Sequence, residues 1–291
     1  MTIASLEQRA ALIRADILKM TTAAGSGHPG GSLSSADIMT VLFSGEVLRH
    51  NPNDTNWLDR DRFILSKGHV APVLYATLAR EGYLPLQELA SLRQFGSRLQ
   101  GHPDMLKLPG VEMSTGSLGQ GLSIAAGLAY ALKVQGAKTG IAPKVYTLLG
   151  DGECQEGQVW EAAMFAAHRR LDNLVAIIDN NGLQIDGRIE DVCDTVDLAD
   201  KFRAFGWQTL EINGHDIAAL LAAFSTVMGC CSDAPYAIIA RTVKGKGISF
   251  MEGQAAWHGK SLNLEQLEQA LAELEPAIGE ITAEDTWQTR S

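Results

Sequence analysis

The sequence predicts an α/β fold with three layers, α/β/α, around a mostly parallel central sheet. Short apolar runs with β-branched residues lie at 145–149, 174–178 and 237–240. These runs are apolar on both faces, as strands covered by helices on each side must be. Amphipathic segments separate them, and glycine-rich or polar residues follow each run directly. In such sheets ligands bind just beyond the carboxyl ends of the strands, so we expect the functional site there.

The first amphipathic segment, residues 6–24, has apolar side chains at close to helical spacing and ends at Gly25-Ser26-Gly27. We therefore expect a helix that leads into a glycine-rich turn. The same spacing predicts further helices at about 35–45, 70–81, 119–135, 157–169, 197–205, 216–227 and 263–274. Because no internal repeat or low-complexity linker interrupts the chain, we expect one domain over residues 1–275 and an acidic, polar tail over 276–291.

The composition allows a full-sized core and argues against one class of protein, the general nucleic-acid binders. The chain has 291 residues, 46% apolar and 20% charged, which is enough to bury a full-sized core. Asp and Glu number 34 against 24 Lys and Arg, and the net charge of −10 argues against a general nucleic-acid binder. A local basic patch such as 244–246 is still suited to a phosphorylated ligand.

Nothing in the sequence predicts insertion into a membrane or export. The N-terminal residues lack a basic start followed by an apolar run, and no stretch approaches the roughly 18 apolar residues of a membrane span. We therefore expect a cytoplasmic protein. The four cysteines, Cys154, Cys193, Cys230 and Cys231, show neither metal-site spacing nor the density of a disulfide scaffold, so we expect reduced thiols.

Two motifs follow neighbouring strands of the expected sheet. Gly150-Asp151-Gly152 comes after the run 145–149, and Asn180-Asn181 comes after the run 174–178. The 27 residues from 153 to 179 accommodate a crossover helix and a second strand, which would place Asp151 and Asn181 side by side. Carboxylate and amide oxygens at one point suit a hard divalent cation that also binds phosphates. A Gly-Asp-Gly tripeptide alone is more often a simple turn, whereas the pair at this spacing is more specific.

Four of the seven histidines lie in glycine-bearing turns. Any single histidine is more often a solvated or core residue, but four in such turns indicate a ligand site, because imidazoles recognise hydroxyls and transfer protons near neutral pH. The segments that carry the four are Ser26-Gly27-His28-Pro29-Gly30, Leu65-Ser66-Lys67-Gly68-His69, Gly101-His102-Pro103 and Trp257-His258-Gly259.

These segments, the two strand-end motifs and Thr115-Gly116-Ser117-Leu118-Gly119-Gln120-Gly121 resemble the transketolases over about residues 5–265. The resemblance implies a thiamine diphosphate-binding domain of the diphosphate-binding type, with Mg²⁺ or Ca²⁺. It assigns the metal to Asp151, Asn181 and Leu183, and the cofactor to His69, Gly116, Ser117, Leu118, Gly152, Glu156, Asn181 and His258. It assigns sugar hydroxyl and carbonyl oxygens, and so catalysis, to His28, His102 and His258.

Three details complete the resemblance. Glu156 matches a glutamate at the subunit boundary of the dimer. Ser117 stands where transketolases usually have proline, so we expect a turn with a less fixed backbone. The loop Arg241-Thr242-Val243-Lys244-Gly245-Lys246-Gly247 also looks like a loop of this family, although a basic, glycine-rich loop is by itself most often a solvated connection.

The family also needs a pyrimidine-binding domain, with the glutamate that activates the cofactor and the groups that bind the sugar phosphate, and no match for it occurs in this sequence. Either a second chain supplies that domain or the sequence is a fragment, and we favour the first. The resemblance then implies one half of a split transketolase, with two copies of each chain in a heterotetramer.

The expected reaction is transfer of a two-carbon ketol unit from a ketose, usually phosphorylated, to an aldehyde. Half of a deoxyxylulose phosphate synthase or of a two-oxoacid dehydrogenase is an alternative within the same chemistry. The segments around His28 and His102 favour transketolase. A non-catalytic, cofactor-binding partner of a complete enzyme is an alternative from another class.

Overall fold

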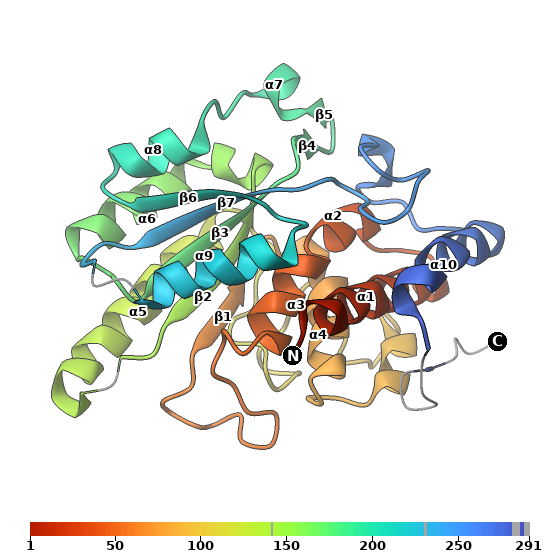
Figure 1. Cartoon of the computed structure of the whole chain (residues 1–291), viewed down its shortest axis with the longest axis horizontal. Helices are drawn as coiled ribbons and strands as arrows, with labels where there is room; N and C mark the ends of the chain where they lie inside the picture. Colours follow the sequence, from red (N-terminus) through yellow and green to blue (C-terminus); the bar gives the residue numbers. More distant parts are fainter. Residues whose placement is uncertain (141, 230–231, 281–285, 288–291) are drawn as a thin grey trace.

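A five-stranded parallel sheet forms the centre of the computed structural model, which describes residues 1–140, 142–229, 232–280 and 286–287 (Figure 1). The strand order is β1-β2-β3-β7-β6, and all four pairings are parallel. The strands are β1 (Arg62–Leu65), β2 (Val145–Gly150), β3 (Leu174–Asn180), β7 (Tyr236–Arg241) and β6 (Gln208–Asn213).

Helices cover both faces of this sheet and complete the expected three layers (Figure 1). One layer contains α1 (Ile3–Ala24), α3 (Ala36–Ser44), α4 (Ala71–Arg80), α9 (Ile217–Gly229) and α10 (Leu264–Ile278). The other contains α5 (Gln120–Thr139), α6 (Gly157–His168) and α8 (Leu198–Ala204). Successive residues of a strand enter opposite cores: Leu148 packs in the first and Leu149 in the second, as the alternation of a pleated strand requires.

The three expected strands are confirmed as β2, β3 and β7, and all eight expected helices form. The sequence reading missed β1, which has four residues, and β6, whose residues are partly exposed at the sheet edge. It also missed the short helices α2 (Pro29–Ser34) and α7 (Ile189–Val192), four 3₁₀ helices, and a hairpin of β4 (Leu183–Gln184) and β5 (Gly187–Arg188). These elements are too short to show a period in the sequence.

Helix α10 lies across the expected domain boundary at residue 275. Helix α10 contains Pro276 and continues to Ile278. Beyond it, Trp287 is buried, and its indole Nε1–H donates a 2.7 Å hydrogen bond to Asp16 on α1. The remainder of the expected polar tail, at 281–285 and 288–291, lies outside the described residues.

Two further expectations concern the cysteines and membranes. Cys154 is buried and Cys193 exposed, both as free thiols, while Cys230 and Cys231 lie outside the described residues. Across the described parts of the chain, no helix combines the length and apolar character that crossing a bilayer requires.

Candidate functional site

A pocket of about 340 Å³ lies beyond the carboxyl ends of β2 and β3. Ten of the residues expected at the site line it: His28, His69, Gly116, Leu118, Asp151, Gly152, Glu156, Asn181, Leu183 and His258. Two expected residues, His102 and Ser117, do not line it, and both are exposed. The structure therefore brings together segments that lie up to 230 residues apart in the chain, from His28 to His258.

Three histidines form a cluster in this pocket. His28 is the N-cap of α2, His69 lies in a 3₁₀ turn after β1, and His258 follows a second 3₁₀ turn. Their ring centroids are 5.2 to 5.4 Å apart. Burial lowers the pKa of His28 to about 4, of His69 to about 2 and of His258 to about 3, with nearby positive charges acting in the same direction. At neutral pH all three rings are therefore uncharged, and each keeps one nitrogen that can accept a hydrogen bond.

His102 lies just outside the pocket, against the turn that contains Gly116. Gly116 has a φ of 145°, and a β-carbon at this position would lie 2.7 Å from His102 Cδ2. A larger residue would therefore displace the imidazole as well as strain the backbone. Tyr75 Oη–H donates to the carbonyl oxygen of His102 at 3.1 Å, and this hydrogen bond fixes the backbone at His102.

Asp151 and Asn181 lie at neighbouring strand ends, as expected from their spacing. Strands β2 and β3 pair in parallel with Gly150 opposite Asp179, and the backbone N–H of Gly182 donates to Asp151 Oδ2 at 2.5 Å. Burial raises the pKa of Asp151 to about 6, and the neighbouring Asp179 carboxylate acts in the same direction. The site thus holds a buried carboxylate whose charged form a cation would stabilise.

The chemistry of the expected metal ligands fits a hard cation. Asp151, Asn181 and Leu183 would offer a carboxylate, an amide oxygen and a backbone carbonyl, all oxygen donors of the kind that Mg²⁺ and Ca²⁺ prefer. Within the part of the chain that the structure describes, no group of three or more His, Cys, Asp or Glu could hold a metal ion. A set with one carboxylate leaves several coordination positions for ligand oxygens, so the residues fit a metal held jointly with a diphosphate.

Two lysines supply positive charge in the pocket: Lys67, which the sequence did not single out, and Lys244, which belongs to the basic patch 244–246. Lys67 Nζ forms a buried ion pair with Asp179 and donates to the Gly31 carbonyl oxygen at 3.2 Å. Lys244 is 2% exposed, and its Nζ lies 2.9 Å from His258 Nδ1. Burial and the charge of Lys67 lower the pKa of Lys244 to about 8. Among the described residues no carboxylate forms an ion pair with Lys244, so this ammonium is available to an anionic ligand.

Loop 241–247, which carries Lys244, is anchored from two sides and is not a solvated connection. The backbone N–H of Val243 donates to His215 Nε2 at 2.8 Å, and the other ring nitrogen of His215 lies 2.7 Å from Asp37 Oδ2. The backbone N–H of Gly245 donates to the Gly30 carbonyl oxygen at 2.9 Å. Lys244 is therefore held in the pocket by the α2 turn on one side and by the His215–Asp37 pair on the other.

Glu153 joins three loops around the pocket and was also missed. Its carboxylate is 3% exposed and accepts hydrogen bonds from Ser66 Oγ, from Gly119 N–H at 2.9 Å and from Gly150 N–H at 3.0 Å. The turn at 116–119, in which serine replaces the expected proline, is thereby tied to the end of β2. This hydrogen bond fixes Gly119, at the end of the turn that contains the serine.

Exposed side chains occur at the rim of the pocket and on helices α5 and α6. Leu118 and Glu156 at the rim are exposed. Tyr130 and Val134 on α5 and Met164 and Phe165 on α6 are each between 39% and 56% exposed, and the rings of Tyr130 and Phe165 lie 6.1 Å apart. We call these four residues the α5–α6 surface. Groups of exposed apolar side chains often mark protein–protein contacts.

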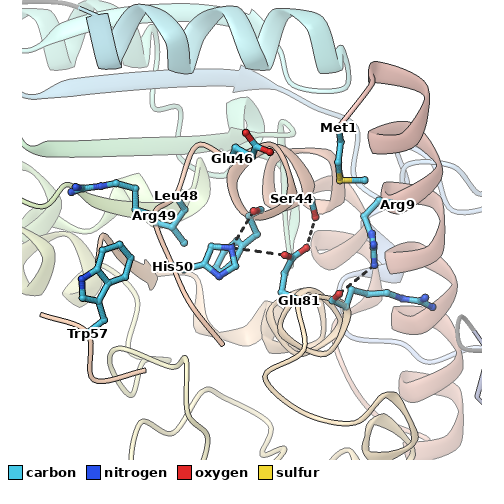
Figure 2. Close-up of a pocket in the computed structure, with 11 residues that line it drawn as sticks. Met1, Arg9, Ser44, Glu46, Leu48, Arg49, His50, Trp57 and Glu81 are labelled. Carbon is cyan, nitrogen blue, oxygen red and sulfur yellow. Dashed lines mark hydrogen bonds and ion pairs between the residues drawn. The ribbon is translucent and has the colours of Figure 1, made fainter. Parts of the chain in front are cut away.

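A larger hollow, of about 540 Å³, lies away from this site, beside α1, α3 and α4 (Figure 2). Most of its polar side chains have partners within the chain: Ser44 with Glu81, His50 with Tyr83 and the Phe43 carbonyl oxygen, Arg49 with Asp61, and Arg9 with the Arg80 carbonyl oxygen. It contains none of the expected site residues, so size alone does not make it the functional site.

Residues 6–277 match the family model described as transketolase, thiamine diphosphate binding domain. A 6-deoxy-6-sulfo-D-fructose transketolase subunit of Clostridium sp. (strain MSTE9) is 42% identical over 93% of this chain and 96% of its own length. An apulose-4-phosphate transketolase subunit of Phocaeicola vulgatus is 39% identical over 98% of this chain and 99% of its own length.

Complete transketolases match over less than half of their length. The transketolase of Mus musculus is 44% identical over 93% of this chain but 42% of its own length. The crystal structure of transketolase from Campylobacter jejuni superimposes with a TM-score of 0.89 at 38% identity, over 94% of this chain and 43% of that one. The fold, the pocket and these matches together show that the chain belongs to the transketolase family, whose thiamine diphosphate binding domain it contains.

Proposed function

We propose that this chain is the diphosphate-binding half of a two-chain transketolase, which transfers a two-carbon ketol unit from a ketose to an aldehyde. The observation that carries the proposal is the extent of the matches. The chain spans nearly the whole of two relatives named as transketolase subunits and 42% of the mouse enzyme. A second polypeptide would therefore supply the remaining domains, including the carboxylate that activates the cofactor.

In this proposal the pocket holds thiamine diphosphate, which supplies the carbanion chemistry of ketol transfer when it is bound. Asp151, Asn181 and Leu183 hold Mg²⁺ or Ca²⁺ together with the diphosphate. The Lys244 ammonium, which has no ion-pair partner among the described residues, neutralises a further diphosphate charge. Gly116, Ser117, Leu118, Gly152, Glu156, His69 and His258 form the remaining cofactor contacts.

Two histidines of the cluster, together with His102 beside the pocket, bind the sugar. His28, His102 and His258 hydrogen-bond its hydroxyl and carbonyl oxygens, and the lowered pKa values keep these rings neutral at physiological pH. A neutral imidazole can both accept and donate a proton at one oxygen, as ketol transfer requires. The two subunit relatives are named for a sulfonated and a phosphorylated sugar, so we propose an anionic sugar as substrate.

The partner covers the mouth of the pocket. Exposed Leu118 and Glu156 at the rim, and the α5–α6 surface beyond them, support a contact with another chain. We infer two copies of each chain, because closed two-fold assemblies are the commonest symmetry and each cofactor needs both domain types. A cytoplasmic location stays a prediction.

Mixing the two chains tests this proposal. The isolated chain should show no ketol transfer, and activity should appear when a chain with a pyrimidine-binding domain is added, with mass photometry reporting a 2:2 complex. Robust turnover by the isolated chain would rule out the two-chain enzyme. A 2:2 complex with no turnover would instead favour a non-catalytic role.

A further inference from the structure

Arg93 has a backbone conformation that arginine rarely adopts. It lies in the loop after the 3₁₀ helix η2 (Leu86–Ser91), and its φ is 58°, in the left-handed region. This region is unfavourable for a residue with a β-carbon, which approaches the following carbonyl oxygen too closely. The backbone N–H of Arg93 donates to the Leu99 carbonyl oxygen at 2.8 Å and closes the loop. Strained conformations of this kind persist only where the surrounding structure holds them in place, and they are frequent at functional sites.

The guanidinium group of Arg93 lies between two turns of the site. Its Nη1–H donates to Ser26 Oγ at 2.8 Å, two residues before His28. Its other side lies against Gly101, directly before His102, where an added β-carbon would be 3.2 Å from Arg93 Cζ. One planar group thus touches both turns that carry substrate-facing histidines.

Few other contacts occupy this guanidinium. Arg93 Nε is buried and has no hydrogen-bond partner, and none of the ion pairs between described residues includes Arg93. If Arg93 served stability alone, we would expect its guanidinium group to form a bidentate ion pair with a carboxylate. Among the described residues its charge thus has no carboxylate partner, and it acts on its surroundings.

The charge of Arg93 lowers the pKa of the imidazoles of His28 and His102. Burial lowers the pKa of His28 to about 4, and the charge of Arg93 is the next largest cause, ahead of His102 and Lys244. The rings of His69 and His258 also face His28, at 5.2 and 5.4 Å between centroids. For the more exposed His102, burial and then Arg93 lower the pKa.

We propose that Arg93 is a positioning residue of the substrate site, which ties the turn of His28 to the turn of His102 and places a permanent positive charge beside both imidazoles. Its two effects are separable. The hydrogen bond to Ser26 sets where the rings lie, and the charge keeps them unprotonated so that they can accept hydrogen bonds from sugar hydroxyls. The inference rests on the proposed function for the identity of the substrate, but not for the effect on the histidines.

Two replacements of Arg93 and one control test this role in the complex with the partner chain. Arg93→Gln removes the charge, and Arg93→Lys keeps the charge but removes the planar fork. Arg98→Gln is the control, because Arg98 lies in the same loop, pairs with Glu88 at 2.5 Å and is not among the charges that lower the pKa of His28 or His102. NMR titration of the histidine ring protons, which needs no turnover, measures the pKa of His28 and His102. The pH profile of kcat/KM for a ketose measures the effect on activity.

In Arg93→Gln we expect the pKa of both histidines, and the acidic limb of the kcat/KM profile, to move upward by about half a pH unit or more. In Arg93→Lys the pKa values should stay in place, while kcat/KM at high pH falls about 2- to 10-fold through the lost hydrogen bond. Thiamine diphosphate affinity should change less than about twofold in both. Arg98→Gln should resemble the wild type.

Unchanged histidine pKa values in Arg93→Gln would overturn the inference, whether or not the complex is active. Equal behaviour of Arg93→Gln and Arg98→Gln would also overturn it, because the effect would then belong to the loop as a whole. If Arg93→Gln does not fold, Arg93→Lys is the test of the positioning role. A kcat/KM of Arg93→Lys at high pH equal to that of the wild type would contradict this role. A wild-type complex without ketol transfer would refute the proposed function. The histidine pKa values measured by NMR would still test the effect of Arg93.

Discussion

Lys67 and Asp179 form an ion pair beneath the pocket, with side chains that are 2% and 0% exposed. Burial alone would raise the pKa of Asp179, but Lys67 and hydrogen bonds from Ser34 and Thr242 keep it below its usual value. The carboxylate therefore stays charged inside the protein, where removal of its partner is costly.

We expect Lys67→Met to lower the free energy of unfolding by about 3 to 5 kcal/mol, because it leaves a buried charge without compensation. Urea denaturation of the isolated chain measures this. Arg241→Met is the matched control, since Arg241 pairs with Glu211 at the surface, where side chains are 70% and 37% exposed and loss of a pair costs about 1 kcal/mol or less. Equal losses in the two variants would contradict a special role of burial.

Asp151→Ala should abolish metal-dependent binding of thiamine diphosphate in the assembled enzyme. Asp151 is the one carboxylate in the proposed ligand set, and without it the metal loses its charged protein ligand. Calorimetry with thiamine diphosphate and Mg²⁺ tests this. Asp186→Ala is the control, because Asp186 lines the same pocket but is exposed and is not a proposed ligand. Wild-type affinity in Asp151→Ala would remove Asp151 from the site.

His102→Ala should reduce turnover while cofactor affinity stays nearly unchanged. His102 lies outside the pocket that would hold the cofactor, against the turn of Gly116. Loss of one hydrogen bond to developing charge typically lowers kcat by about 10²- to 10³-fold. Steady-state kinetics and calorimetry on the same preparation separate the two quantities. A variant that loses cofactor but keeps turnover at saturating cofactor would show that His102 belongs to the cofactor site.

The histidine cluster should make stability depend on pH below neutrality. The folded-state pKa of His69 is about 2, below its ordinary value of 6.5, so in the range between these values the unfolded chain binds more protons than the folded one. The free energy of unfolding therefore falls as the pH falls below about 6.5. His28 and His258, with pKa values of about 4 and 3, act in the same direction.

Replacing one ring isolates this effect. His69→Gln removes one site of proton uptake on unfolding, so any stability advantage of the wild type over this variant should shrink between pH 7 and pH 5. Urea denaturation at several pH values measures the difference. A difference that does not vary with pH would show that His69 titrates alike in the folded and unfolded chains.

The elements that were predicted correctly are those whose apolar residues recur with the period of a helix or form a continuous buried run. The buried runs of β2, β3 and β7 and the long helices have clear apolar patterns, whereas β6 is a partly exposed edge strand and β1 has four residues. The turns with glycine and histidine were predicted because they combine unusual residues within a few positions. Most of them converge on one pocket.

The missed residues depend on long-range contacts. Lys67 and Asp179 are 112 positions apart. Lys67 follows β1 and Asp179 lies near the end of β3, and they meet because the parallel strands bring their carboxyl ends to the same edge of the sheet. Glu153 and Arg93 likewise act through segments remote in sequence, and neither stands out by its type. Such residues become visible when the folded structure shows which charges are buried and which lack a partner.

The position of β7 between β3 and β6 has a consequence for how the chain acquires its structure. Strand β6 is made before β7, yet within the five-stranded sheet it pairs with β7 alone. During synthesis β3 and β6 therefore present open edges, which invite association with other chains. Sheets built from such distant pairings also fold slowly. Elongation has to reach Arg241 before the sheet beneath the pocket can close.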